Sequence, residues 1–173
     1  SPSIRYTVEA KSPDNEGEGG RRAFQSSFVY TCRDTKTKQV LWIRKQPMGK
    51  PEIVGGMAFE SPKEASPVSI FVSDTGWTVI RTGWDELVAV DLAGCDRGRV
   101  NLLSEGFTKD ERRDYVHDTT AGPTWCRYSL WYFLEADDQQ LFILRPWWGR
   151  RVIMNIETGE LLQATDHTIV GAE

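Results

Sequence analysis

The order of apolar and polar residues along the chain predicts a series of short β-strands. Ile4, Tyr6 and Val8 alternate with polar residues, and this period of two is typical of a strand with one buried face. Further strand-length apolar runs are separated by segments rich in Gly, Pro, Asp and Asn, which favour turns and loops. The runs lie at residues 23–32, 39–45, 57–59, 68–72, 77–81, 87–92, 101–103, 128–134, 141–145, 152–156 and 161–162.

Short turns join the three runs between residues 68 and 92, and this spacing predicts an antiparallel meander. Residues 128–134 are almost continuously apolar, which predicts a central strand covered on both faces. Thr108 and Glu111 have the spacing of a capping box and predict one short helix. The predicted fold class is therefore all-β, with antiparallel meanders and one short helix. A β-sandwich or an irregular barrel is the alternative.

The length of 173 residues predicts a single domain over residues 1–173. A chain of this length buries a sizeable core without help from disulfides or metal. Within the domain we expect N-terminal strands and loops at 3–67, a middle meander at 68–103, a short helix at 108–117 and a C-terminal meander at 127–162.

The two meanders match each other in sequence at an offset of 64 residues. Both read as a strand, an Asp turn, a strand ending in Arg, a turn containing Trp, and a strand ending in Asp or Asn. The matching pairs are Asp74 and Asp138, Arg81 and Arg145, Trp84 and Trp148, Val88 and Val152, and Asp91 and Asn155. This pattern predicts two repeated structural units.

Residues 73–77 (Ser-Asp-Thr-Gly-Trp) and 155–159 (Asn-Ile-Glu-Thr-Gly) resemble blades of bacterial β-propellers of the quinoprotein and NHL type. In those blades an Asp-Gly turn precedes one strand and a D-x-x-T-G turn follows a later one. The resemblance covers about half the chain and implies propeller-like packing. Because propeller blades repeat at about 40–45 residues, the spacing of 64 implies an incomplete ring. The chain also resembles secreted bacterial β-repeat proteins, which implies no particular activity.

Charge and hydropathy exclude some classes of partner. The formal net charge is -4 and no block of basic residues is present, so we expect no nucleic-acid partner. No apolar run approaches the roughly 18 residues of a transmembrane helix, so no transmembrane segment is predicted. We expect an extracytoplasmic location, secreted or periplasmic, with a cytoplasmic location as the alternative. The oligomeric state is left open.

Cysteines and histidines predict little chemistry. Three cysteines, Cys32, Cys95 and Cys126, leave at least one without a partner in the same chain, and we interpret them as small buried apolar residues. His117 follows the predicted helix, where its positive form is favourable, and a catalytic pair with Asp118 is the alternative. No nucleophile elbow, EF-hand loop or zinc spacing is present. The sequence predicts no catalytic residue, metal site or cofactor.

The strongest surface candidate is the turn around Trp147 and Trp148, flanked by Arg145, Arg150 and Arg151. Arg against Trp can bind a sugar or the carboxylates of a partner protein. The favoured interpretation is that both tryptophans close the core and the arginines lie across them. We therefore expect a non-enzymatic binding or structural module with a protein or a glycan as partner.

Two alternatives stay open for the function. The first is a glycan- or small-ligand-binding module that uses the same Trp and Arg residues. The second is a hydrolase built on carboxylates, as in glycosidases. That alternative needs two carboxyl groups facing one cleft at about 5–9.5 Å.

Overall fold

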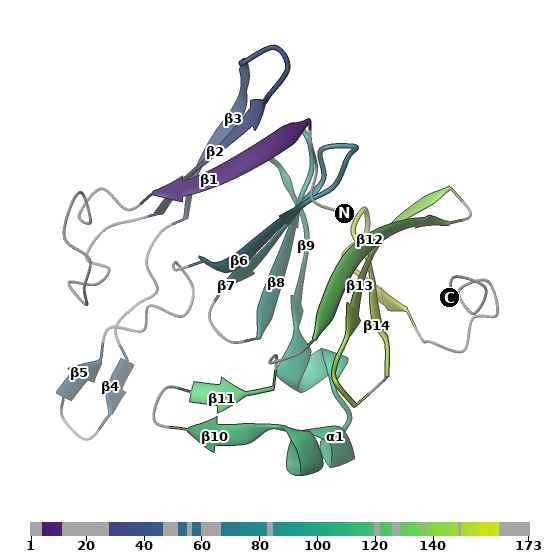
Figure 1. The fold of residues 1–173 in the computed structure, drawn as a ribbon. Helices are drawn as coiled ribbons and strands as arrows, with labels where there is room; N and C mark the ends of the chain where they lie inside the picture. Colours follow the sequence, from purple (N-terminus) through teal and green to yellow (C-terminus); the bar gives the residue numbers. More distant parts are fainter. Residues whose placement is uncertain are drawn as a thin grey trace.

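The computed structural model describes residues 5–11, 28–46, 52–54, 57–59, 67–82, 85–119, 122–125, 129–136, 138–148 and 150–162. Most of these residues lie in antiparallel strands (Figure 1). The strands are β1 Tyr6–Lys11, β2 Phe28–Asp34, β3 Val40–Gln46, β4 Glu52–Val54, β5 Met57–Phe59, β6 Pro67–Val72, β7 Thr78–Thr82, β8 Glu86–Val90, β9 Asp96–Asn101, β10 His117–Thr119, β11 Gly122–Thr124, β12 Leu130–Ala136, β13 Gln139–Arg145, β14 Val152–Asn155 and β15 Leu161–Leu162.

Three main sheets carry the fold. The first sheet has the strand order β1-β2-β3, the middle sheet β6-β7-β8-β9 and the third sheet β12-β13-β14-β15. The pairs β4-β5 and β10-β11 form separate two-stranded ribbons. The all-β prediction with antiparallel meanders is confirmed. Within the described part of the chain no sheet closes on itself, so the strands do not form a barrel there.

Three hairpins, one in each main sheet, are built on the same kind of turn. Asp34, Asp91 and Asn155 each stand at the end of a strand, and one side-chain oxygen of each accepts two backbone N–H groups from the turn. An Asx turn of this kind lets a short polar side chain replace backbone partners. The donors are Lys36 and Thr37 for Asp34, Ala93 and Cys95 for Asp91, and Glu157 and Thr158 for Asn155, at 2.8–3.2 Å.

Aligning the sheets on these three turns brings equivalent residues into register. The strand pairing shifts register directly after Cys32 in the first sheet and directly after Ala89 in the middle sheet. Each of these residues stands at the same distance before the Asp that begins its turn. At this position, residues directly opposite one another on neighbouring strands form a row across each sheet. The row is Val8–Cys32–Trp42 in the first sheet, Phe71–Val79–Ala89–Gly98 in the middle sheet and Tyr132–Ile143–Ile153–Leu162 in the third sheet. Strands β1, β7 and β13 are therefore equivalent, and the first sheet has no described counterpart of β6 and β12.

The middle sheet packs between the other two. Ile80, Val88 and Val90 form one core cluster with residues of the first sheet, including Tyr30 and Cys32. Successive side chains on a strand point to opposite faces, so the neighbours of these residues supply the opposite face. The second cluster joins Val79, Leu87, Ala89, Val100, Phe142, Leu144, Val152, Met154 and Ile156.

The sheets also meet at their outer strands, and glycines permit the approach. Trp42 on β3 packs against Gly94 in the turn of the middle sheet, and an added Cβ at Gly94 would lie 2.8 Å from the Cβ of Trp42. Gly98 on β9 packs against Gly159 in the turn of the third sheet, and an added Cβ at Gly98 would overlap the Gly159 backbone. The outer strands of the first and middle sheets thus each contact a turn glycine of the next sheet.

Two expectations for individual strands are wrong. The strand expected at 101–103 is wrong beyond Asn101, the last residue of β9. Leu102–Gly106 form a π-helix, because the Asn101 side chain accepts the N–H of Ser104 and starts a helical turn. The apolar run at 128–134 gives β12, which lies at the edge of its sheet and not in its centre. Both faces of β12 contact apolar residues, and an edge strand can be covered in this way as well as a central one.

The predicted helix is present as α1, Lys109–Tyr115, with its capping box formed in both directions. The Thr108 hydroxyl accepts the N–H of Glu111 at 3.2 Å, and the Glu111 carboxylate accepts the N–H of Thr108 at 2.8 Å. Neither helical segment of the described chain has the length and apolar character that crossing a membrane requires.

Candidate functional site

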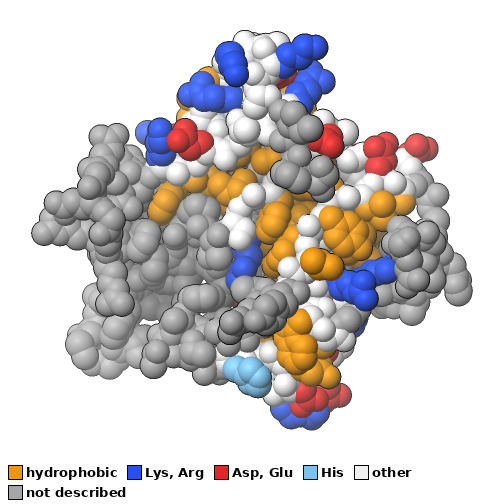
Figure 2. Space-filling model, viewed as in Figure 1, with side chains coloured by type: hydrophobic (Ala, Val, Ile, Leu, Met, Phe, Trp, Pro, Cys, Tyr) orange, Lys and Arg blue, Asp and Glu red, His pale blue; other side chains and the backbone are white. Residues whose placement is uncertain are grey.

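A groove lies where the first strand of each main sheet approaches the others. Strands β1, β6 and β12 each stand at the edge of their sheet, and they face a common space in Figure 1. This space is a hollow of about 390 Å³, within the usual range for ligand pockets. Figure 2, viewed from the same side, shows hydrophobic side chains gathered where these strands approach one another.

Aromatic side chains dominate the groove lining. Phe71 on β6 stacks on Trp131 of β12 with ring centres 5.1 Å apart, and Phe142 lies within 5.8 Å of both rings. The aromatic rings on β6 and β12 are half-buried, so they keep surface that a ligand could cover. The full lining is Tyr6, Thr7, Val8, Ile70, Phe71, Val72, Trp131, Tyr132, Phe133 and Phe142, which includes no Asp or Glu.

Consecutive residues of each strand line the groove, three from β1, three from β6 and three from β12. Because side chains alternate along a strand, three consecutive residues cannot all point to one side. The strand backbones therefore form part of the wall. The groove offers a ligand both aromatic faces and peptide groups.

A series of aromatic contacts connects the groove to the Trp147–Trp148 turn. Trp131 contacts Trp125 at 5.8 Å, and Trp125 contacts Phe107 at 5.0 Å. Phe107 in turn contacts Trp148 at 5.3 Å. The guanidinium of buried Arg81 lies 5.0 Å from the Trp125 ring and 5.7 Å from the Trp131 ring. The described cation–π contact with tryptophan is thus made by Arg81 on β7, away from the arginines that flank the turn.

Trp148 and Arg150 are engaged by Glu111 of α1. The Trp148 indole donates to the Glu111 carboxylate at 2.9 Å, and Arg150 pairs with the same oxygen at 2.6 Å while also donating to the Gly106 carbonyl. Burial acts to raise the pKa of Glu111, but these donors and the N–H of Thr108 lower it on balance. This arrangement fixes α1 to the turn between β13 and β14.

The other residues of the predicted turn site are placed differently. Trp147 is 52% exposed and meets Tyr115 edge-on at 5.2 Å, so the interpretation that both tryptophans close the core is wrong for Trp147. An adjacent pair leaving β13 cannot easily turn both rings inward. Trp148 is half-buried and stacks on Tyr115 at 4.9 Å. Arg145 is exposed and Arg151 is half-buried.

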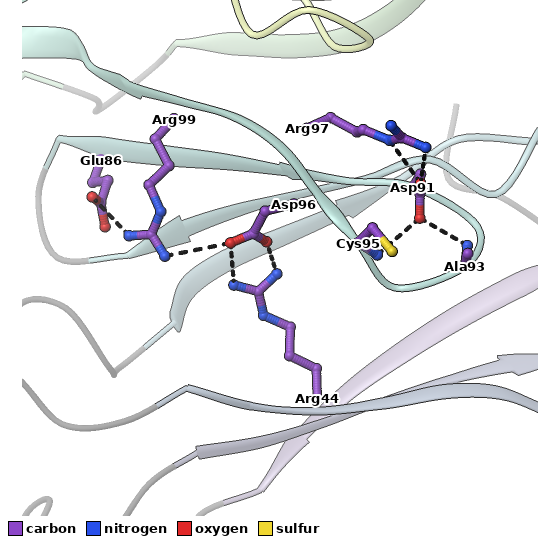
Figure 3. A network of polar contacts seen from close by, with 8 residues as sticks. All are labelled: Arg44, Glu86, Asp91, Ala93, Cys95, Asp96, Arg97 and Arg99. Carbon is purple, nitrogen blue, oxygen red and sulfur yellow. Dashed lines mark hydrogen bonds and ion pairs between the residues drawn. The ribbon is translucent and has the colours of Figure 1, made fainter.

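A second polar cluster ties the first and middle sheets together (Figure 3). Arg44 on β3 makes a two-pronged contact with Asp96 on β9, and Arg99 bridges Asp96 and Glu86. Burial, followed by repulsion from Arg99, lowers the pKa of Arg44. The charges in this cluster satisfy one another, which indicates a structural role.

Asp91 in the same view pairs with Arg97 at 2.6 Å. Burial acts to raise its pKa, but the N–H of Cys95, the Arg97 side chain and the N–H of Ala93 lower it on balance. Burial raises the pKa of Tyr30, in the neighbouring core, to about 12.

The cysteines and histidines give no reactive centre among the described residues. Cys32 is buried and free, whereas Cys95 is free and exposed, so the expectation that it is buried is wrong; Cys95 lies in a turn. His117 is exposed at the start of β10. Cys126 and His167 lie outside the described residues. Within the described ranges no group of three or more His, Cys, Asp or Glu could hold a metal ion.

The groove was missed by the sequence prediction because its residues come from three segments far apart in the chain. One local signal pointed to it, namely the aromatic run Trp131, Tyr132 and Phe133. No protein-family model matches this chain, and the search of curated proteins finds no significant match.

Proposed function

We propose that this chain is a non-enzymatic binding module of propeller-like units, and that its ligand occupies the groove between β1, β6 and β12. The observation that carries this proposal is the hollow of about 390 Å³ with half-buried aromatic walls. Covering aromatic surface is favourable by roughly 25 cal/mol per Å², and each ring offers a large area. Ligands with apolar or planar groups fit such walls best.

The propeller-like part of the proposal rests on the equivalent rows of the three sheets and their face-to-face packing. In such an arrangement the first strand of each unit faces a shared axis, and ligands bind there. The lack of Asp and Glu in the groove lining favours binding over carboxylate-based hydrolysis at this site.

The test is a screen of ring-containing small molecules read by methyl NMR. Ile70 and Val72 line the groove and report binding there, while Ile43, which is 64% exposed on β3, reports non-specific effects. Binding should shift the Ile70 and Val72 signals and leave Ile43 unchanged. Phe133→Leu removes a ring of the wall and should weaken binding about tenfold. Trp147→Leu is the matched control, because it removes a ring outside the groove.

A second candidate is glycan binding at the exposed Trp147, favoured by its edge-on contact with Tyr115. Trp148 and Arg150, whose side chains donate to Glu111, would hold the turn in place and would not contact the sugar. A glycan array probed with the unmodified protein, with Trp147→Leu and with Phe133→Leu separates the two candidates. Sugar signals lost with Trp147→Leu would favour the turn, whereas signals lost only with Phe133→Leu would favour the groove.

A further inference from the structure

The three main sheets differ in one strand, and the difference lies at the groove. On the alignment set by Asp34, Asp91 and Asn155, β6 and β12 precede β7 and β13 in their sheets. Strand β1 is the equivalent of β7 and β13. Of the described strands, only β2 pairs with β1.

The hollow borders the side of the first sheet where the extra strand would lie. Tyr6, Thr7 and Val8 of β1 form one wall of the hollow, and β6 and β12 form the others. Strand β6 approaches β1 without hydrogen-bonding into its sheet. A wall of three consecutive strand residues is roughly 7 Å long between its end residues, which suits a peptide of about three residues at its centre.

The equivalent rows also indicate which side chain would lie beside Val8 on an added strand of the first sheet. In the middle sheet the row begins with Phe71 beside Val79, and in the third sheet with Tyr132 beside Ile143. The corresponding row of the first sheet begins at Val8. An aromatic residue next to Val8 would repeat the pattern and would point toward the middle sheet, as Val8 and Cys32 do.

We propose that the groove binds an extended peptide segment of a partner protein, which adds to the edge of β1 as a fourth strand and places an aromatic side chain beside Val8. This proposal rests on the proposed function, since it names the ligand class of the same groove. Strand addition supplies affinity through main-chain hydrogen bonds and specificity through alternate side chains.

The probe is a synthetic peptide with the β6 sequence of residues 68–72, Val-Ser-Ile-Phe-Val, flanked by lysines for solubility. This sequence occupies the equivalent place in the middle sheet. Binding should slow hydrogen exchange of amides in β1 between Thr7 and Lys11 and leave the exchange of β3 unchanged. Replacing the peptide's Phe by Ala should weaken binding about tenfold.

Two series of N-methylated peptides test the strand geometry. Adjacent amides of a strand point to opposite sides, so methylating one alternate set should weaken binding about tenfold for each hydrogen bond lost, while the other set binds nearly as before. Equal sensitivity of both sets, or protection confined to β7, would overturn the proposal.

The outcomes also separate this proposal from the proposed function. If the peptide leaves β1 unprotected while ring compounds still shift Ile70 and Val72, strand addition is refuted and the groove remains a small-molecule site. If neither peptide nor ring compounds perturb the groove, both proposals fail.

Discussion

The two faces of the middle sheet form unlike interfaces from one alternating sequence. On β8, Val88 and Val90 pack toward the first sheet, whereas Leu87 and Ala89 pack toward the third. A register slip of one residue would exchange these sets and present each neighbour with side chains of the wrong shape. The alternation therefore specifies two interfaces together.

The core residues at the two interfaces differ. Toward the first sheet the core cluster combines the rings of Phe28, Tyr30 and Trp42 with aliphatic side chains, and the Arg44–Asp96 ion pair closes its outer edge. Toward the third sheet the buried core is mostly aliphatic around Phe142, and partly buried rings such as Phe71 and Trp131 pack against it. The Gly98–Gly159 contact closes the edge of this interface. Because the core cluster toward the third sheet is the larger of the two, that interface should contribute more to stability.

The largest expected effect is at the interface between the middle and third sheets. Phe142→Ala should lower the free energy of unfolding by about 3–5 kcal/mol, because Phe142 is 1% exposed and contacts Phe71, Trp131 and Phe133. Ile80→Ala, on the face toward the first sheet, should cost less, about 2–3 kcal/mol. Urea unfolding measures both. A greater loss for Ile80→Ala would contradict the ranking of the two interfaces.

The outer edge of the same interface should tolerate no added carbon. Gly98→Ala should cost about 3 kcal/mol, because the new Cβ meets the Gly159 backbone, which can yield only by separating two sheets. Arg99→Ala on the same strand is the control and should cost about 1 kcal/mol or less, since its ion pairs are partly exposed. Thermal unfolding distinguishes the two variants. A neutral Gly98→Ala would show that the sheets separate freely at this edge.

Attachment of α1 to the third sheet gives a smaller effect. Glu111→Gln should cost about 2 kcal/mol, because the carboxylate accepts from both Trp148 and Arg150. Asp110→Asn makes the same chemical change at an exposed pair with Arg113 and should cost less than about 0.5 kcal/mol. Denaturant unfolding followed by near-ultraviolet circular dichroism reports the tryptophan environment as well. Equal costs for the two variants would mean that Glu111 contributes no more than a surface charge.

The smallest effect compares two equivalent turns, one with Asp91 and one with Asn155. Asp91→Asn keeps a side-chain oxygen for the turn but loses the Arg97 pair, so it should cost under about 1 kcal/mol at neutral pH. The folded-state pKa of Asp91 is lowered. Its contribution is therefore complete above the unfolded pKa of about 3.9 and is lost as the pH falls through the lower folded value.

The Asp91→Asn variant should consequently lose less stability than the wild type on going from about pH 5 to pH 2. Urea midpoints measured across that range give the comparison. The reciprocal change, Asn155→Asp, should introduce acid sensitivity at the third sheet. Identical pH profiles for the wild type and Asp91→Asn would remove Asp91 as a source of acid sensitivity.

Prediction from sequence succeeded where the signal was local. The capping box at Thr108 and Glu111 formed as expected, because both partners lie within one turn of helix. The repeat was predicted for two units only. The first unit uses Asp34, which lies 57 residues before Asp91, whereas Asp91 lies 64 residues before Asn155, so one constant offset cannot align all three. The shared Asp-x-x-Thr and Asn-x-x-Thr turns at Asp34 and Asn155 were the available signal.

The candidate turn site was predicted in composition but not in orientation. The sequence could not indicate that the carboxylate of Glu111, 37 residues from Trp148, accepts hydrogen bonds from both Trp148 and Arg150. It also could not predict that Trp147 is exposed and Trp148 half-buried. The two residues are adjacent and identical, and only the packing around the turn decides which ring points inward.

By itself, the sequence determined most strands of the three main sheets and the turns between them, since these depend on residue alternation and on side chains that bond their own backbone. Tertiary structure alone decided that the middle sheet lies between the other two and that β1, β6 and β12 enclose a groove. The reason is that sheet stacking is selected by the shapes of whole faces, such as Gly98 against Gly159, and those faces are assembled from residues that no local pattern connects.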